Sequence, residues 1–500
     1  MNKTILDYFD KIYTCYPNKI ALVDSKREAT FKTVSDEAHK IANALFEFAE
    51  NKSPVVVYLD KSIEAVISFL GIVYSGNFYS PIDPDMPMER IKIILKTLKP
   101  VAIVTSRKYC DLVKNYGYKV LIYEDIILNY TTKITSERRI DINNNDILYV
   151  LFTSGSTGIP KGVMIQQYSV INYITWLSKT FDINQDSCLG NQAPLYFDNS
   201  VLDIYSCILL GATVYLIEKE LFTQPIRLVE QIKNNSIDTI FWVPSVFNFL
   251  VKFNTLDEIS LQGYIKNVLF AGEVMPTKTI NYLINHLGKE TVFANLYGPT
   301  EATVDCTYYI IKDILPASET IPIGKAIDNV EVMVISETGE LISCEDEIGE
   351  LCVKGCCLSK GYYNNPEKTK EVFVLNPFRT IENEIIYKTG DYVKYNSSGQ
   401  LIYIARKDQQ IKHLGNRIEL GEIEAATMRI QDINNCCCCY DSQKKRIILF
   451  VESELETSRI KSELRKLIPG YMIPHKVIHM EHLPLNSNGK IDRIKLKESL

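Results

Sequence analysis

A loop rich in glycine and hydroxyl residues, which follows a short apolar run at 150–152, constrains this chain more than any other stretch. The run is typical of the end of a buried strand. Small residues let the backbone approach a ligand, and hydroxyl and N–H groups can surround phosphate oxygens. A Walker A loop is excluded, because Pro160 stands where that motif has the glycine before its lysine. The pattern predicts a phosphate-binding loop, with a Ser/Gly-rich surface turn as the alternative. Its residues are Thr153, Ser154, Gly155, Ser156, Thr157, Gly158 and Lys161.

Length and charge limit the class of protein. A chain of 500 residues is too long for one core, so two or more domains are expected. The formal net charge of −6 argues against a nucleic-acid surface. The N-terminus does not have the pattern of a signal peptide, and no apolar run is long enough to span a bilayer. We therefore expect a cytoplasmic protein that does not insert into membranes.

The 13 cysteines are expected to be reduced thiols, because the chain has no secretory signal. The four consecutive cysteines at 436–439 could suggest a metal site. On a strand, however, successive side chains point to opposite faces and cannot converge on one tetrahedral ion. A buried strand paired with the apolar segment 447–451 is the favoured interpretation.

Short strand-like runs alternate with helical patterns over the first 300 residues, which predicts an α/β fold with parallel sheets. From about residue 320 the pattern changes to short strands and turns, which indicates a small β-rich subdomain. The last ninety-odd residues have a strand–helix–strand pattern of their own and indicate a separate domain. The strand-like runs of the first part are 55–59, 101–105, 120–123, 212–217, 239–243 and 268–271.

Three further segments carry polar side chains suited to nucleotide chemistry. The Gly-Pro turn within 295–305 places Thr300 beside Glu301, a combination that suits Mg²⁺ bound between protein and triphosphate. Asp391 ends the string YKTGD, where an aspartate at a strand end can accept hydrogen bonds from ribose hydroxyls. Lys490 lies on a loop of Asn, Ser and Gly from which a long cation can reach a cleft. Taken singly, each could be an ordinary solvated side chain.

Together these segments resemble the adenylate-forming superfamily, which includes amino-acid adenylation domains of nonribosomal peptide synthesis, D-alanine–carrier protein ligases, acyl-CoA synthetases and luciferases. The resemblance runs in order along nearly the whole chain. The strings that carry it are TSGSTGIPKG (153–162), FDNS (197–200), YGPTE (297–301), GELCVKG (349–355) with GYYNNPEKT (361–369), YKTGD (387–391), RKDQQIKHLGNRIE (406–419), YMIP (471–474) and NGKIDR (488–493).

The resemblance implies an α/β fold with a large N-terminal AMP-binding core over residues 1–404, made of stacked α/β sheets and a small β-barrel subdomain at about 320–404. A small, mobile α+β lid would cover residues 405–500 and rotate about Asp408. It also implies ATP and Mg²⁺. Thr153 to Lys161 would hold the β- and γ-phosphates, and Lys490 would contact both the substrate carboxylate and the α-phosphate. The remaining roles would be α-phosphate binding by Thr300, Mg²⁺ binding by Glu301, adenine contact by Asn295 and Tyr297, and ribose binding by Asp391 and Arg406.

The amino-acid branch of the superfamily is favoured by FDNS, because Asp198 occupies the position that pairs with a substrate ammonium. Asp305 is a second carboxylate, which suits a hydroxyl- or amine-bearing side chain, and the set is nearest to serine-type patterns. D-alanine remains the alternative, although it would leave Asp305 unpaired and Ala271 stands where the D-alanine ligases have cysteine. The pocket positions implied by the family are Asp198, Asn199, Leu202, Ser245, Leu269, Ala271, Leu296, Val304 and Asp305.

The expected reaction is ATP-dependent formation of an aminoacyl-AMP and pyrophosphate from a small amino acid. The aminoacyl group would then pass to the phosphopantetheine thiol of a carrier protein, expected to be a separate protein because no carrier domain follows Lys490. Two alternatives remain: a carboxylic-acid–CoA ligase of the same fold, and a degenerate nucleotide-binding scaffold without activity.

Overall fold

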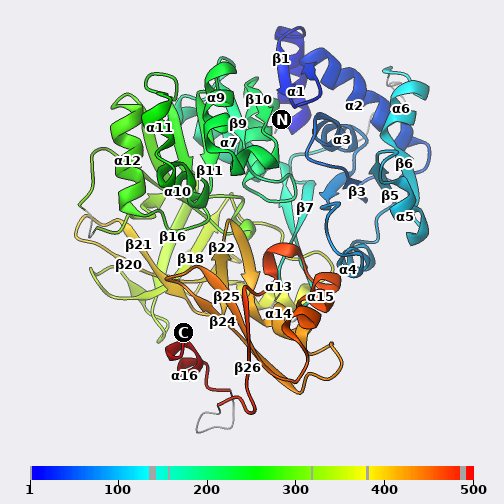
Figure 1. The fold of residues 1–500 in the computed structure, drawn as a ribbon. Coiled ribbons are helices and arrows are strands. Elements are labelled where there is room, and N and C mark those ends of the chain that lie inside the picture. Colours follow the sequence, from blue (N-terminus) through cyan, green and yellow to red (C-terminus); the bar gives the residue numbers. More distant parts are fainter. Residues whose placement is uncertain (1–2, 134–141, 156–157, 317–318, 379–381, 485–490) are drawn as a thin grey trace. The chain divides into compact units, whose positions relative to one another are not determined.

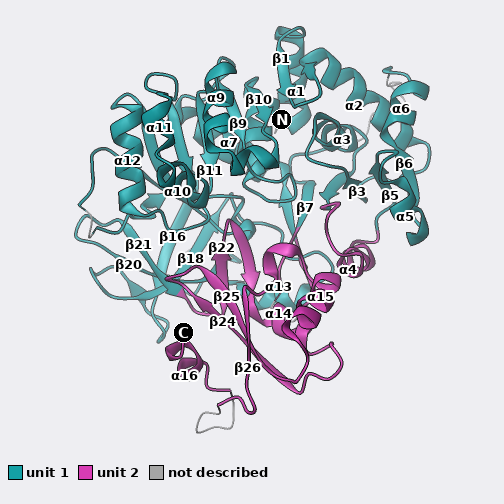
Figure 2. Cartoon of the chain, in the orientation of Figure 1, with its two compact units in different colours: residues 1–82, 100–151, 163–405 teal, residues 83–99, 152–162, 406–500 magenta. Residues whose placement is uncertain are grey.

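The computed structural model describes residues 3–133, 142–155, 158–316, 319–378, 382–484 and 491–500. The chain forms two compact units (Figure 2). Unit 1 comprises residues 1–82, 100–151 and 163–405, and unit 2 comprises 83–99, 152–162 and 406–500. Two short segments from the first third of the sequence thus belong to unit 2. The expected division into residues 1–404 and 405–500 did not assign these segments to the C-terminal part, and it stays a prediction.

The first sheet of unit 1 has six strands in the order β6-β5-β3-β4-β7-β8, and its central strands pair in parallel. β3 is buried along its whole length, as expected for a strand covered on both faces. Thr30 and Ser62 cap the helices α2 and α3 beside this sheet. The elements are α2 (Phe31–Phe46), β3 (Pro54–Tyr58), α3 (Ile63–Tyr74), β4 (Phe78–Pro81), β5 (Ala102–Thr105), α5 (Cys110–Val113), β6 (Lys119–Ile122), α6 (Tyr123–Asn129), β7 (Ile147–Thr153) and β8 (Lys161–Gln166).

The second sheet has nine strands in the order β15-β14-β13-β12-β11-β9-β10-β1-β2. Its strands β1, β9, β10 and β11 are labelled in Figure 1. The strands from β13 to β1 are parallel, and the pairs at both edges are antiparallel. The strands are β1 (Ile20–Val23), β2 (Glu28–Thr30), β9 (Cys188–Asn191), β10 (Thr213–Leu216), β11 (Thr239–Trp242), β12 (Asn267–Phe270), β13 (Val292–Tyr297), β14 (Thr307–Ile311) and β15 (Lys325–Ala326).

Alternating residues of these strands enter two cores on opposite faces of the second sheet. Ile240 and Trp242 of β11 pack with α9, α10 and α12, whereas Phe241 joins the core that contains α7 and α8. The carboxyl ends of β9, β11, β12 and β13 therefore meet at one edge, where parallel α/β sheets bind ligands. The helices are α1 (Ile5–Cys15), α7 (Gln167–Phe181), α8 (Ser200–Leu210), α9 (Pro225–Asn234), α10 (Pro244–Lys252), α11 (Thr255–Glu258) and α12 (Thr277–Leu287).

The third sheet of unit 1 lies in the predicted β-rich region and is antiparallel. The prediction that Asp391 ends a strand is wrong, because β20 continues to Tyr395. The pairing of β18 with β20 is irregular between Glu350 and Cys352, and Gly390 has φ of +73°. Asp391 is thus placed by an irregularity inside a strand. The elements are β16 (Val330–Ile335), β17 (Leu341–Ile342), β18 (Gly349–Gly355), α13 (Pro366–Val372), β19 (Phe373–Leu375), β20 (Ile385–Tyr395) and β21 (Leu401–Arg406).

Unit 2 contains a hairpin and a three-stranded sheet. The hairpin of β22 and β23 directly precedes α14. Its turn holds Leu414 and Gly415 at positive φ. A buried ion pair between Arg90 and Glu422 joins α4 to α14. The elements are α4 (Met88–Leu98), β22 (Gln410–His413), β23 (Asn416–Glu419), α14 (Leu420–Thr427), β24 (Asn435–Asp441), β25 (Arg446–Glu452), α15 (Thr457–Leu467), β26 (Lys476–His479) and α16 (Arg493–Glu498).

The structure confirms the buried cysteine strand. Residues 436–439 lie in β24 and pair antiparallel with β25. Cys436 and Cys438 enter one core, while Cys437 and Cys439 enter the core on the other face. Within the described ranges, no group of three or more His, Cys, Asp or Glu side chains could hold a metal ion. Over the same ranges no helix is both long and apolar enough to cross a membrane.

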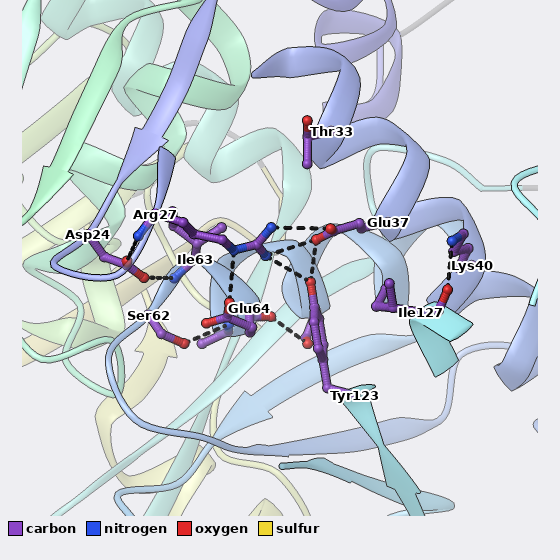
Figure 3. Close-up of polar contacts among 12 residues, drawn as sticks. Asp24, Arg27, Thr33, Glu37, Lys40, Ser62, Ile63, Glu64, Tyr123 and Ile127 are labelled. Atoms are coloured by element: carbon purple, nitrogen blue, oxygen red, sulfur yellow. Dashed lines mark hydrogen bonds and ion pairs between the residues drawn. The ribbon is translucent and has the colours of Figure 1, made fainter. Parts of the chain in front are cut away.

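An ion-pair cluster around Arg27, here named the Arg27 cluster, joins β2 to α2, α3 and α6 (Figure 3). The Arg27 guanidinium donates to Glu37 at 2.9 and 3.2 Å and to Glu64 at 3.0 Å. It also donates to the Tyr123 hydroxyl at 3.3 Å, and that hydroxyl donates to Glu37. The cluster fixes elements of unit 1 that contain no predicted site residue.

Candidate active site

The predicted substrate pocket lies along one edge of the second sheet. Asp198 and Asn199 follow β9 and lead into α8, which carries Leu202. Ser245 begins α10 after β11, and Leu269 and Ala271 lie at the end of β12. Leu296 lies on β13, and Val304 and Asp305 follow the 3₁₀ turn Thr300–Ala302. The nine predicted pocket residues therefore lie on β12 and β13 or on the segments that follow β9, β11, β12 and β13.

Two contacts in this region involve residues that the sequence analysis did not assign. The Ser245 hydroxyl donates to the Glu273 carboxylate, so the segment 270–273 contributes an acid beside the predicted pocket residues. The Tyr173 hydroxyl donates to Asp305 at 2.6 Å, and both side chains are only 1% exposed. Burial, followed by the charge of Asp305, raises the pKa of Tyr173 well above its ordinary value.

A buried acid on α8 was also missed. Asp203 is 0% exposed and accepts a hydrogen bond from the Asn191 amide at 2.8 Å. Lys61 donates to the backbone oxygens of Asn191 and Gln192 at 3.2 and 3.1 Å. Burial raises the pKa of Asp203 to about 7 and lowers the pKa of Lys61 to about 7. The sequence did contain a signal for this residue, because Asp203 is an acid within the apolar run of α8. Acids are rarely buried without a partner, so such a position indicates a polar cluster.

These three residues, named the α8 cluster (Lys61, Asn191 and Asp203), are incompletely hydrogen-bonded. Asp203 Oδ1 and Asn191 Oδ1 are buried and have no hydrogen-bond partner among the described residues. Buried polar groups normally have partners, so open acceptors call for an explanation. Asp203 lies one helical turn after Asn199, and the cluster therefore supports the start of α8, where two pocket residues lie.

The residues expected to bind adenosine are partly brought together. The Tyr297 hydroxyl donates to the Asp391 carboxylate, although the two residues lie on different sheets of unit 1. The Asn295 amide donates to the backbone oxygen of Pro322 at 2.8 Å. In unit 2, Arg406 pairs with Asp408 at 2.5 and 2.9 Å, which the sequence did not predict. Burial raises the pKa of Asp408, but the Arg406 guanidinium outweighs this effect and holds that pKa below its ordinary value.

The expected magnesium residue is a fully buried acid. Glu301 is 0% exposed, and one of its carboxyl oxygens accepts a hydrogen bond from the Tyr362 hydroxyl at 2.7 Å. It shares the 3₁₀ turn with Thr300. Mg²⁺ usually binds one or two carboxylates and takes its other ligands from phosphates and water. A single buried carboxylate beside a threonine hydroxyl therefore fits Mg²⁺ held between the protein and a triphosphate.

The phosphate loop belongs to unit 2 and is followed by the strand β8. The Thr153 hydroxyl is buried and has no hydrogen-bond partner in the described part of the chain, so it could bind a ligand oxygen. At Gly155 a Cβ would overlap the backbone oxygen of Ile159, and Gly158 has φ of +78°. The fold of the loop thus requires small residues at these two positions. Ser156, Thr157 and Lys490 lie outside the described residues.

The phosphate loop contacts β23 within unit 2. Ser154 donates to the backbone oxygen of Arg417 at 2.9 Å. Lys161 Nζ lies 3.9 Å from the Glu419 carboxylate, which also accepts from the Gln410 amide at 2.9 Å. Burial raises the pKa of Glu419 despite the opposing charge of Lys161. The cation expected to bind phosphate thus faces a carboxylate of its own unit in this structure.

Comparison with known proteins identifies the family. The model of the AMP-binding enzyme family matches residues 9–363, and the model of the AMP-binding enzyme C-terminal domain matches residues 422–490. The chain belongs to the AMP-binding enzyme family. Its family relatives include ligases, and the prediction of an adenylate-forming ligase is confirmed at this level.

Three similar proteins match this AMP-binding enzyme along nearly its whole length. It is 33% identical over 99% of its residues to bacitracin synthase 1 from Bacillus licheniformis, of which it spans 9%. It is 31% identical to the D-alanine–D-alanyl carrier protein ligase from Bacillus cytotoxicus, over 98% of each chain. The structure of holo-PA1221, an NRPS protein containing adenylation and PCP domains, superimposes with a TM-score of 0.85 over 100% of this chain and 84% of that one, at 24% identity. The predicted α/β fold, with a large N-terminal and a smaller C-terminal domain, is confirmed.

Proposed function

We propose that this AMP-binding enzyme activates a small amino acid with a polar side chain, serine-like in type, and transfers it to a carrier protein. In the first step a substrate carboxylate oxygen attacks the α-phosphorus of ATP, and the bond to pyrophosphate breaks. In the second step the phosphopantetheine thiol of the carrier loses its proton and attacks the acyl carbon, and AMP leaves. The products are pyrophosphate, AMP and an aminoacyl thioester.

Two carboxylates at the pocket edge support an amino-acid substrate. Asp305 is buried and bonded to Tyr173, and the pKa of Tyr173 also rises in response to the charge of Asp198. The two acids therefore lie near the same phenol. A carboxylate at a largely apolar site is stabilised by neighbouring cations or hydrogen-bond donors. The ammonium of an amino acid can offset Asp198, whereas an aliphatic acyl chain has no group that could.

The remaining roles follow the family assignment. Lys490 and Thr300 stabilise charge that develops around the α-phosphate, since preorganised donors contribute most where charge appears. Mg²⁺, when bound at Glu301, supplies positive charge near the phosphates. Rotation about Asp408 separates the two half-reactions. Adenosine is bound by Asn295, Tyr297, Asp391 and Arg406, and the β- and γ-phosphates by residues 153–161.

The test is amino-acid-dependent ATP–pyrophosphate exchange over a panel of L- and D-amino acids. We expect the highest kcat/KM for a small amino acid with a side-chain hydroxyl or amine. Lys490→Ala should reduce exchange by about a hundredfold, as loss of a preorganised charge does. Exchange that is unchanged in Lys490→Ala would contradict the assignment.

D-alanine is the second candidate, because a D-alanine–D-alanyl carrier protein ligase matches over 98% of both chains. Exchange with D-alanine alone would favour it. CoA-dependent release of AMP with acids that lack an amine would indicate an acid–CoA ligase. ATP binding without exchange for any acid would indicate a scaffold.

A further inference from the structure

The turn that presents Asp305 has a conformation that its residues rarely adopt. Thr303 and Val304, which directly precede Asp305, have φ of +52° and +69°. Both are β-branched, and β-branched residues at positive φ are outliers. Such strain persists where the surrounding structure fixes the backbone, and it concentrates at ligand-binding sites.

Specific contacts hold this turn in place. The Thr303 hydroxyl donates to the backbone oxygen of Cys357 at 2.6 Å, and the Asp305 N–H donates to the backbone oxygen of Thr303 at 3.0 Å. Gly298 leaves room for the turn, because a Cβ there would overlap the backbone oxygen of Val304 and lie 2.6 Å from Asp305 Cα. The backbone of Asp305 is therefore fixed from both sides.

The side chain of Asp305 is oriented by Tyr173. This phenol comes from α7 and donates to Asp305 Oδ2 at 2.6 Å. Its ring is tilted against that of Trp176, with 5.8 Å between the centroids. Because burial and the charge of Asp305 raise its pKa well above the ordinary value, the phenol keeps its proton and acts as a donor at neutral pH. A carboxylate can accept about four hydrogen bonds, and this contact sets the plane in which the others must lie.

We propose that Tyr173 is a specificity-determining positioning residue, which orients the Asp305 carboxylate so that the pocket selects amino acids with a side-chain hydroxyl or amine donor. This inference rests on the proposed function. It adds a residue of α7 to the predicted pocket positions. It also gives the strained turn at Thr303 and Val304 a function, because a carboxylate discriminates between donors only when both its backbone and its plane are fixed.

The experiment compares the best substrate of the exchange panel with its analogue that lacks the side-chain donor, for example serine with alanine. In Tyr173→Phe, the ratio of kcat/KM for the donor-bearing substrate to kcat/KM for its analogue should fall by about tenfold. This is the effect of losing a hydrogen bond to a charged group. The change should lie mainly in the KM of the donor-bearing substrate. The analogue should change by less than about threefold.

Tyr205→Phe is the matched control, because Tyr205 is also buried and its hydroxyl bonds, among the described residues, to the Tyr79 hydroxyl at 2.8 Å. This substitution also removes a phenol oxygen from the core, but the oxygen it removes is bonded to another phenol and not to a carboxylate. It should leave the ratio unchanged. Asp305→Asn is a second variant that keeps an acceptor for Tyr173, and it should lower the ratio even if Tyr173→Phe folds poorly.

The outcomes separate this inference from the proposed function. If the wild-type enzyme exchanges with no amino acid, the proposed function fails. If it exchanges and a folded Tyr173→Phe keeps the wild-type ratio, the function stands and the role of Tyr173 is overturned, whatever the ratio in Asp305→Asn. A preferred substrate without a side-chain donor would overturn it as well.

Discussion

The Arg27 cluster and the α8 cluster both combine acids and bases within unit 1, but they differ in how completely they are bonded. In the Arg27 cluster, the guanidinium donates to two carboxylates and a phenol (Figure 3). In the α8 cluster, Asp203 and Asn191 each keep one buried acceptor without a partner in the described structure. Polar networks that only support a fold are generally satisfied, because an unpaired buried group is costly.

The two clusters also differ in what they support. The Arg27 cluster joins elements that hold no predicted site residue, whereas Asp203 lies on the helix that begins beside Asp198 and Asn199. The comparison indicates that the first cluster stabilises unit 1 and the second positions the substrate pocket at some cost in stability. The predictions below test that division.

The largest effect is expected for Asp203→Ala. Removal of the side chain leaves the buried Asn191 amide without its acceptor and opens a cavity in a fully buried site, which should lower the free energy of unfolding by about 3 kcal/mol. Both tryptophans, Trp176 and Trp242, lie in unit 1, so their fluorescence during urea unfolding reports on this unit. Pyrophosphate exchange should fall as well. A variant as stable and active as the wild type would show that the α8 cluster has neither role.

A pH dependence of stability is the next effect. Burial raises the pKa of Asp203 to about 7 from an ordinary value of 3.8. Between these values the folded carboxyl keeps a proton that the unfolded chain has released. Its contribution to stability is therefore complete below pH 3.8 and is lost as the pH rises to about 7. Asp203→Asn should flatten this dependence by about 2 kcal/mol, measured by tryptophan fluorescence from about pH 4 to 7. An unchanged slope in Asp203→Asn would refute the shift.

The smallest effect is expected for Arg27→Met. Its partners are partly exposed and can be solvated after the substitution, so the free energy of unfolding should fall by only about 1 kcal/mol. The kcat/KM of pyrophosphate exchange and the choice of amino acid should stay within about twofold of wild type. If Arg27→Met altered substrate choice, the contrast between the two clusters would not hold.

Local patterns in the sequence predicted most of the fold. Apolar runs located β3, β5, β6, β7, β10, β11 and β12, whereas β4, β9 and β13 were not predicted. The switch to short strands located the third sheet. The cysteine strand followed from alternation alone. The hairpin at 410–419 was missed because its residues are mostly charged or polar and give little apolar alternation. Asp391 was misplaced because the irregularity that positions it depends on pairing with β18.

The candidate site was predictable only where a short motif holds its residues. Glu301 and Thr300 are adjacent in the sequence, so their common turn could be predicted. Tyr173 and Asp305 are separated by 132 positions, and no local pattern connects them. The ion pair of Lys161 with Glu419 likewise depends on tertiary structure. Such contacts join segments that lie far apart in the sequence, so no local pattern predicts them.

The central claim, that Asp198 and its surroundings recognise an amino acid, is tested most directly with a substrate that lacks the amine. Pyrophosphate exchange would be measured for serine and for 3-hydroxypropanoate, which differs from serine only by the missing amine, in the wild type and in Asp198→Ala. The wild type should prefer serine by about a thousandfold, because the half-buried Asp198 carboxylate loses the ammonium when the amine is missing. Asp198→Ala should reduce this preference to below about tenfold. If Asp198→Ala kept the full preference for serine, the assignment of Asp198 and with it the account of the pocket would be contradicted.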